Sequence, residues 1–130
     1  ATGLIKMTRL AMEANPDSEM WKIAGSLENA GGRTACDGVR AGDKASIEVF
    51  NKYIDYLACG IVSLINIFQP EILCLGGGIS KEGDFLLKPL NEKVEAEQYT
   101  RGDIPKTKLM IAKLGNDAGI IGAAFLGRQH

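Results

Sequence analysis

The chain has 130 residues, of which 45% are apolar and 24% are charged, and its formal net charge is −1 at pH 7. This length fits one ordinary domain, and this composition is that of a folded globular protein and not of a disordered one. Because the charge is nearly balanced, the chain offers no strongly basic surface, so we expect neither nucleic acid nor a membrane surface as a partner.

Three cysteines, Cys36, Cys59 and Cys74, are widely spaced and form no CxxC pair, and the lone histidine, His130, is at the tail. This pattern indicates neither a zinc site nor a disulfide framework, so we expect no metal ligands in the chain. Cys59 and Cys74 lie in apolar stretches and are expected to be buried, reduced thiols. No leader pattern opens the chain and no uncharged apolar run reaches the roughly 18 residues of a membrane span, so a cytoplasmic location is expected.

Helices are predicted first in chain order. Apolar residues at helical spacing from Leu4 to Met12 predict a helix that stops at Asn15–Pro16, and a short helix follows through Trp21 and Ile23. The segment Thr34–Asp37 has the pattern of a capping box, which places the next helix between Thr34 and about Ala41. Gly42 should end that helix.

A long helix is predicted from Asp43 to Phe68. Asp43 is a favourable N-cap, apolar residues then recur every three to four positions, and Gln69–Pro70 ends the pattern. The second half of this helix is apolar almost all round. We therefore expect both of its sides to pack against protein.

The remaining elements alternate between strand and helix. Glu71–Leu75 is a short apolar run between Pro70 and three glycines, which predicts a buried parallel strand. A helix around 85–94, a strand at 107–112 and a helix at 117–126 follow. This order predicts a βαβ unit with two parallel strands and a final helix.

The candidate binding site is the loop Gly76–Gly77–Gly78–Ile79–Ser80, directly after the first strand. In open α/β sheets ligands bind beyond the carboxyl ends of the strands, and glycines let a phosphate or a ribose approach backbone N–H groups closely. Ser80 could add a hydroxyl contact or cap the next helix. Because the loop matches neither GxxxxGK[ST] nor GxGxxG, it predicts no P-loop and no Rossmann site. A nucleotide-binding loop and a tight structural turn both remain open.

Other polar residues have structural explanations at least as good as functional ones. Asn116 and Asp117 follow the second strand, where they could contact a ligand or cap the last helix. One side of that helix is made smooth by small residues, which favours close packing on the long helix. These residues are Gly119, Gly122, Ala123 and Ala124. No Ser/His/Asp set and no pair of carboxylates is defined by spacing, so no catalytic residue is predicted.

Four segments together resemble one family. They are 41–45 (AGDKA), 65–71 (INIFQPE), 75–80 (LGGGIS) and 115–124 (GNDAGIIGAA). In this order they resemble the C-terminal portion of the ROK family (repressors, open reading frames and kinases), and most closely its glucokinase-like members. By this resemblance residues 1–130 are a C-terminal fragment of one kinase lobe, with a variable helical region at 1–33 and the core helices and βαβ-α unit at 34–130.

The resemblance implies an α/β fold of the actin-like, ribonuclease-H-like (hexokinase-type) class, in which two lobes clamp ATP and a sugar. The function it implies is ATP-dependent phosphorylation of a hexose hydroxyl, with Mg²⁺ bound to ATP. Gly76, Gly77, Gly78, Ile79 and Ser80 would contact the nucleotide. The family's phosphate loop, catalytic aspartate and zinc motif have no counterpart in these residues, so we expect the chain to be inactive by itself.

The resemblance also implies partners. The family's N-terminal lobe would be missing, and strands that would pair beside Leu73 would be absent, so we expect an open sheet edge and self-association or domain swapping. An alternative is the C-terminal effector lobe of a sugar-responsive ROK repressor, which would carry a DNA-binding helix-turn-helix upstream. A third possibility is a freestanding module without a ligand.

Overall fold

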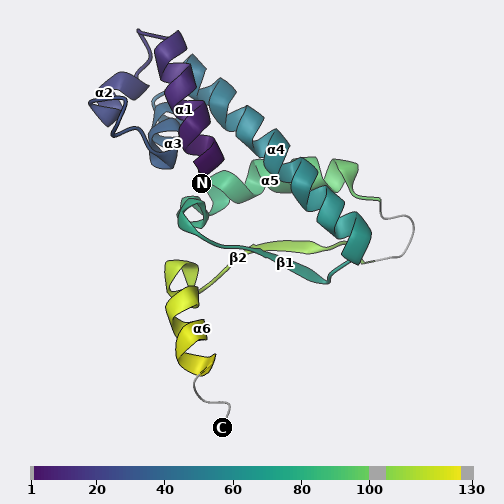
Figure 1. Ribbon diagram of the computed structural model, residues 1–130. Coiled ribbons are helices and arrows are strands. Elements are labelled where there is room, and N and C mark those ends of the chain that lie inside the picture. Colours follow the sequence, from purple (N-terminus) through teal and green to yellow (C-terminus); the bar gives the residue numbers. More distant parts are fainter. Residues whose placement is uncertain (1, 100–104, 127–130) are drawn as a thin grey trace. The chain divides into compact units, whose positions relative to one another are not determined.

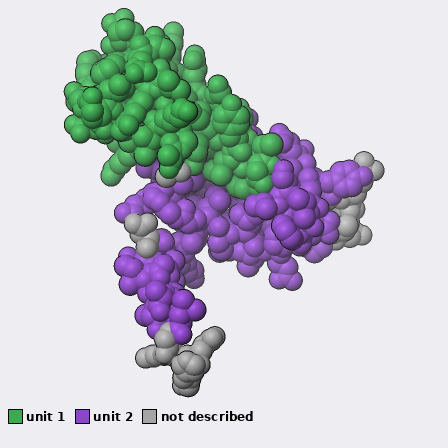
Figure 2. Space-filling model, viewed as in Figure 1, with its two compact units in different colours: residues 1–61 green, residues 62–130 purple. Residues whose placement is uncertain are grey.

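The computed structural model describes residues 2–99 and 105–126 (Figure 1). It divides into two compact units, residues 1–61 (unit 1) and residues 62–130 (unit 2), which Figure 2 colours separately. The elements in chain order are α1 (Thr2–Ala14), α2 (Met20–Ala24), α3 (Gly32–Arg40), α4 (Lys44–Phe68), β1 (Ile72–Leu75), the 3-10 turn η1 (Gly78–Glu82), α5 (Asp84–Glu97), β2 (Lys108–Ile111), the 3-10 turn η2 (Gly115–Asp117) and α6 (Ala118–Leu126).

Helix α1 forms where the apolar spacing predicted it. Its buried residues Leu4, Thr8 and Met12 are four apart, which places them on one face of the helix. The Thr8 hydroxyl donates a hydrogen bond of 2.8 Å to the Leu4 carbonyl, so this polar group is satisfied inside the core. Packed beside Met12 are Met20 and Ala45, and the Trp21 indole N–H donates to the Met12 carbonyl at 2.9 Å.

Helix α3 begins earlier than predicted. Gly31 has extended backbone angles and is the N-cap, and the Thr34 hydroxyl accepts a hydrogen bond of 3.0 Å from the Gly31 N–H. Thr34 therefore lies in the first turn and is not the cap. The pattern was correctly read as a helix start, but it was placed one turn too late.

Gly42 ends α3, as predicted, and the next residue starts α4. Gly42 has a φ of 78°, its N–H donates to Val39, and the Asp43 N–H donates to Gly38, both at 3.0 Å. This pair of bonds is the glycine-stop motif of helix C-termini. The Asp43 carboxylate then accepts the Ser46 N–H at 2.8 Å, which confirms Asp43 as the N-cap of α4.

Helix α4 has 25 residues and the predicted limits, but its second half is not covered on both sides. Ile54, Ile61 and Ile65 are buried, whereas Tyr56 and Ile67 are 63% and 71% exposed. The expectation of protein on both sides was wrong, because no described part of the chain packs on the outer side. In the described residues no helix is both long and apolar enough to cross a bilayer.

Unit 2 contains the predicted βαβ unit. Strands β1 and β2 are parallel neighbours joined through α5, with Leu73 opposite Leu109. The ladder extends past both strand ends, since the Lys108 N–H donates to Glu71 at 2.9 Å and the Ala112 N–H donates to Leu75 at 2.8 Å. Helix α5 contacts β2 and contributes a buried face that consists of Leu86, Leu90 and Val94.

Two expectations of burial in this region were wrong. Strand β1 is only half covered: Leu73 and Leu75 are partly buried, whereas Ile72 is 53% exposed and Cys74 is exposed. Cys59 on α4 is exposed as well, so the apolar surroundings of these two thiols in the sequence do not translate into burial. For Cys74 the cause is that alternate strand residues face opposite sides of a sheet, and only the side of Leu73 and Leu75 is partly covered.

Helix α6 forms as predicted but is not packed as predicted. None of its residues is buried, and Gly119 and Gly122 have no atom within 4 Å of the position that a Cβ would occupy. The smooth side that these residues form therefore does not lie against the long helix.

Candidate functional site

The candidate site lies beyond the carboxyl ends of the two parallel strands. The loop after β1 leads into η1 and the loop after β2 leads into η2, and these two turns are in contact. Because parallel strands end at the same edge of a sheet, both loops border the same region of the surface. This is the location where open α/β sheets bind ligands.

The loop after β1 is held in a fixed shape by Gly77 and Ser80. Gly77 has a φ of 81°, a conformation that side chains rarely adopt, and its carbonyl accepts hydrogen bonds from the Ser80 N–H at 3.2 Å and from the Ser80 hydroxyl at 2.7 Å. Ser80 is only 4% exposed. Its hydroxyl therefore closes the turn.

The N–H groups at the tip of this loop are available for a ligand. Within the residues that the structure describes, the N–H groups of Gly77, Gly78 and Ile79 donate to no protein acceptor. Gly76, Gly77 and Gly78 are exposed, so water satisfies these groups when nothing else is bound. Adjacent free N–H groups of this kind suit the oxygen atoms of a phosphate or a ribose.

Packing within the chain does not require glycine at positions 76 and 78. A Cβ on Gly78 would meet nothing within 4 Å, and one on Gly76 would be 3.9 Å from the Ala112 Cβ, an ordinary contact. Neither residue has a positive φ. Because these two residues carry no side chain, the backbone at Gly76 and Gly78 is open to close approach from outside the chain.

The second loop contributes backbone and an exposed carboxylate. Gly115 has a φ of 50° and its N–H donates to Ala112 at 3.2 Å, and the Asp117 N–H donates to Leu114 at 2.9 Å. Asp117 is exposed, and in the described part of the chain its carboxylate accepts no hydrogen bond from a backbone N–H of α6. The capping role expected for Asp117 is therefore not seen.

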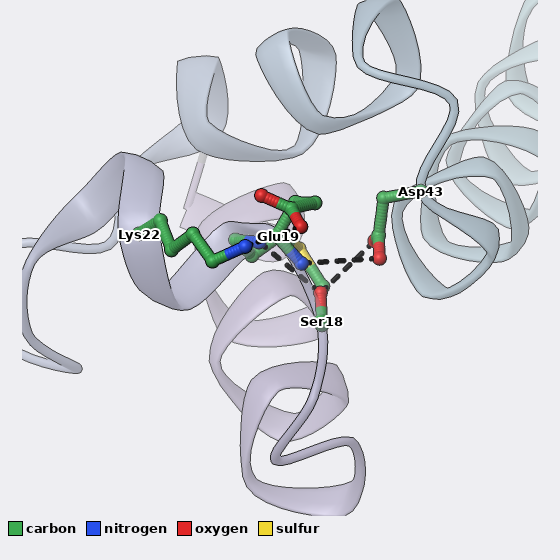
Figure 3. A network of polar contacts seen from close by, with 5 residues as sticks. Ser18, Glu19, Lys22 and Asp43 are labelled. Carbon is green, nitrogen blue, oxygen red and sulfur yellow. Dashed lines mark hydrogen bonds and ion pairs between the residues drawn. The ribbon is translucent and has the colours of Figure 1, made fainter.

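A network of polar contacts that involves Ser18, Glu19 and Asp43 lies in unit 1 and is structural (Figure 3). The Asp43 carboxylate accepts hydrogen bonds from the Ser18 hydroxyl at 2.9 Å, the Ser46 hydroxyl at 2.6 Å and the Glu19 N–H at 3.2 Å. Partial burial acts to raise the pKa of Asp43, but the hydrogen bonds from Ser46, Ser18 and Glu19 together outweigh it and hold the pKa below its usual value. A carboxylate with this many donors is a fixed cap and not an available base.

Sequence patterns gave no sign that Ser18 belongs to this network. Ser18 and Asp43 are 25 positions apart, and only the folded chain shows that the loop before α2 meets the start of α4. Lys22 pairs with Glu19 at 2.6 Å at the edge of the network, and this exposed ion pair adds little stability.

Unit 1 also contains two surface hollows. One is lined by residues of α1 and α4, among them Leu10, Val49 and Lys52, and the other by the 14–19 loop and the start of α4. The second hollow contains Ser18 and Asp43, but their hydrogen bond of 2.9 Å belongs to the cap of α4 described above. In the described residues no group of three or more His, Cys, Asp or Glu side chains is placed to hold a metal ion.

The chain was compared with known proteins. It is 35% identical to a glucokinase of Thermotoga maritima over 100% of this chain and 41% of that protein, and 36% identical to a glucokinase of Halalkalibacterium halodurans over 100% of this chain and 39% of that protein. An N-acetylgalactosamine kinase of Shewanella is 35% identical over 68% of this chain and 28% of its own length. The chain thus spans about two-fifths of the length of the glucokinases that it matches.

A solved structure supports the same relationship. The structure of a ROK family glucokinase from Streptomyces griseus in complex with glucose and AMPPNP matches with a TM-score of 0.83 and 26% identity, over 98% of this chain and 42% of that one. The predicted actin-like α/β fold is confirmed by this match. The model of the ROK family matches residues 8–130. The chain therefore belongs to the ROK family.

Proposed function

We propose that the chain is part of an ATP-dependent hexose kinase of the glucokinase type and that it supplies one wall of the nucleotide site. The observation that carries this proposal is the group of unpaired N–H donors at Gly77, Gly78 and Ile79, at the carboxyl end of β1 and beside the loop that follows β2; Gly77 and Gly78 are exposed. The kinase names of the relatives, and the AMPPNP and glucose in the related structure, support it.

In this proposal Gly76 to Ile79 contact the nucleotide through their backbone, and Ser80 acts by closing the turn. The donors are fixed before the ligand arrives because Ser80 is bonded to the Gly77 carbonyl, so binding requires little reordering. Mg²⁺ would come with ATP and neutralise charge on the transferred phosphoryl group.

We further propose that these residues do not catalyse phosphoryl transfer by themselves. The Asp43 carboxylate accepts four hydrogen bonds within the described part of unit 1 and is fully engaged as a cap. The base, the sugar contacts and the other half of the nucleotide site would be supplied by a further lobe, in a protein that works in the cytoplasm, where thiols such as Cys74 stay reduced.

The alternative of a ROK repressor lobe shares this fold, and an effector site for a sugar would not need ATP. ATP binding at the glycine loop therefore separates the two functions. The relatives named above are kinases, which favours the kinase.

The proposal is tested by titrating the ¹⁵N-labelled chain with Mg-ATP and following its amide signals by NMR. We expect the signals of Gly77, Gly78 and Ile79 to shift, with affinity in the millimolar range because only one wall is present. Gly78→Val should abolish the shifts, since its side chain would fill the space above the loop, which is empty of protein atoms.

Gly60→Val is the matched control. Gly60 in α4 also has nothing within 4 Å of a Cβ position, but it is remote from the strand ends in the sequence and should leave the ATP-induced shifts intact. Unchanged signals at Gly77 and Gly78 in saturating Mg-ATP would refute the nucleotide role, and glucose-dependent ADP formation by the chain alone would refute its inactivity.

A further inference from the structure

The Ser80 side chain is buried behind the loop that carries the free N–H donors. Ser80 is 4% exposed, and its hydroxyl donates to the Gly77 carbonyl at 2.7 Å. The Ser80 N–H donates to the same carbonyl at 3.2 Å, so this one oxygen accepts two hydrogen bonds from one residue. A hydroxyl that is buried and already bonded offers little surface to a ligand. Its effect on a ligand must therefore pass through the loop.

The two bonds from Ser80 fix the orientation of a single peptide group. The Gly77 carbonyl and the Gly78 N–H belong to the same trans peptide group, which is planar, so they point in opposite directions. Because the carbonyl points to Ser80, the Gly78 N–H points away from Ser80. Gly78 is exposed, and in the described part of the chain its N–H has no protein acceptor.

This peptide group has little else to hold it. It joins Gly77 to Gly78, and neither residue has a Cβ that would restrict rotation about the adjoining bonds. Gly77 has a φ of 81°, in the region that glycine enters without strain. The orientation of the peptide group therefore depends on the bonds to the Gly77 carbonyl, and the shorter of these comes from the Ser80 hydroxyl.

Ser80 is in turn attached to the core of unit 2. Its carbonyl accepts the Gly83 N–H at 3.1 Å, and the Gly83 carbonyl accepts the Leu86 N–H at 3.1 Å. Leu86 is a fully buried residue of α5. The chain of hydrogen bonds thus runs from the core helix through Ser80 to the Gly77–Gly78 peptide group.

We propose that Ser80 is a positioning residue, whose hydroxyl holds the Gly77–Gly78 peptide group so that the Gly78 N–H is directed at an oxygen atom of the nucleotide. The same bond polarises the peptide group and makes its N–H a stronger donor. A donor that is oriented before binding costs less conformational entropy when the ligand arrives. This inference rests on the nucleotide role proposed above and names the side chain that prepares that site.

The test compares the ¹⁵N-labelled wild-type chain with Ser80→Ala. The variant keeps the 3.2 Å backbone bond but loses the hydroxyl bond. We expect its dissociation constant for Mg-ATP to rise about two- to tenfold, the factor that corresponds to one neutral hydrogen bond. In the ligand-free variant the order parameter of the Gly78 amide should fall from about 0.85 to below about 0.6.

Thr107→Val is the matched control. The Thr107 hydroxyl donates to the Pro70 carbonyl at 2.6 Å, at the opposite ends of the same two strands. Valine has the shape of threonine without the hydroxyl, so this variant also loses one bond from a hydroxyl to a backbone carbonyl. Urea unfolding should show a similar loss of stability for both variants. Thr107→Val should keep the wild-type affinity for Mg-ATP and the wild-type order parameter at Gly78.

Three outcomes would overturn the positioning role. They are equal Mg-ATP affinity of the wild type and Ser80→Ala, an unchanged order parameter at Gly78 in Ser80→Ala, and an equal loss of affinity in Thr107→Val, which would mark a general effect of stability. A wild-type chain that does not bind Mg-ATP at all would instead refute the nucleotide role itself, and the positioning role would fall with it.

Discussion

Unit 1 and unit 2 differ in how completely they satisfy their own groups. In unit 1 the helix ends are capped by Gly42 and Asp43, the serine hydroxyls of the network are paired, and Leu4, Met12 and Met20 are fully buried. In unit 2 the glycine loop keeps unpaired donors, and α6 and one sheet face remain exposed. In the described residues, unit 1 therefore satisfies its polar groups and buries its large apolar side chains more completely than unit 2 does.

The largest expected effect tests whether burial in unit 2 is confined to its α5 side. Leu90→Ala removes a fully buried side chain and should lower the free energy of unfolding by about 2–5 kcal/mol, because a cavity remains. Ile120→Ala on α6 should cost less than about 0.5 kcal/mol at concentrations where the chain is monomeric. Urea unfolding measures both, and a similar loss for both variants would contradict the exposure of α6.

The second effect tests the packing of unit 1. A Cβ on Gly38 would overlap the Ser46 hydroxyl and lie 2.7 Å from the Ser46 Cβ, so Gly38→Ala should destabilise by about 1–3 kcal/mol. Gly60→Ala in α4 meets nothing and should stabilise by about 0.5–1 kcal/mol, because alanine favours the helix. Opposite shifts in the thermal midpoint are expected, and an unchanged or raised midpoint for Gly38→Ala would show that the contact with Ser46 relaxes.

The third effect concerns the Asp43 cap. Asp43→Ala should cost about 1–2 kcal/mol at pH 7, the range for loss of an N-cap. Because the pKa of Asp43 is lowered in the folded state, its contribution is present above the unfolded pKa of about 3.9 and is lost as the pH falls through the folded pKa. The gap between wild type and variant should therefore narrow as pH falls below about 4.

The control for this cap is Asp17→Ala, in the same loop as Ser18. Asp17 is exposed, so its removal should change stability little at any pH. A gap between wild type and Asp43→Ala that stays constant down to pH 2 would show that the cap does not depend on the charge of Asp43.

The smallest effect returns to unit 2. Gln98 is 8% exposed, and among the described residues neither its amide nitrogen nor its amide oxygen has a hydrogen-bond partner. Gln98→Leu removes this unsatisfied group and should stabilise the chain by about 1 kcal/mol. Chemical unfolding measures the gain, and a loss of stability would mean that the amide is satisfied in solution.

Much of the fold followed from local patterns. The limits of α4 were predicted correctly from the N-cap Asp43 and from the helix-ending pair Gln69–Pro70. Both strands were located from the short apolar runs before Gly76 and after Thr107. These predictions succeeded because caps, helix-breaking residues and short apolar runs act on residues that are adjacent in the sequence. Burial was harder to predict. Cys74 and helix α6 are apolar in sequence but are not buried. An apolar side chain is more stable when it is buried, but the sequence does not show whether other residues of the chain pack on it.

The candidate site was located in part by sequence. The glycines after β1 marked the place, but the use of the Ser80 hydroxyl inside the turn and the contact between η1 and η2 depend on tertiary structure. The hydrogen bond between Ser18 and Asp43 could not be predicted from sequence patterns either, because the two residues are 25 positions apart and meet only in the folded chain.

The continuity of helix α4 affects whether the two units can be separated by proteolysis or by expression as halves. The boundary between the two units falls between Ile61 and Val62, inside an unbroken helix that continues from Lys44 to Phe68. A protease needs an extended segment of backbone, and no connecting loop exists at this boundary for it to cut. Limited proteolysis is therefore not expected to separate the two units at this boundary, and recombinant halves divided there would each carry a severed helix end.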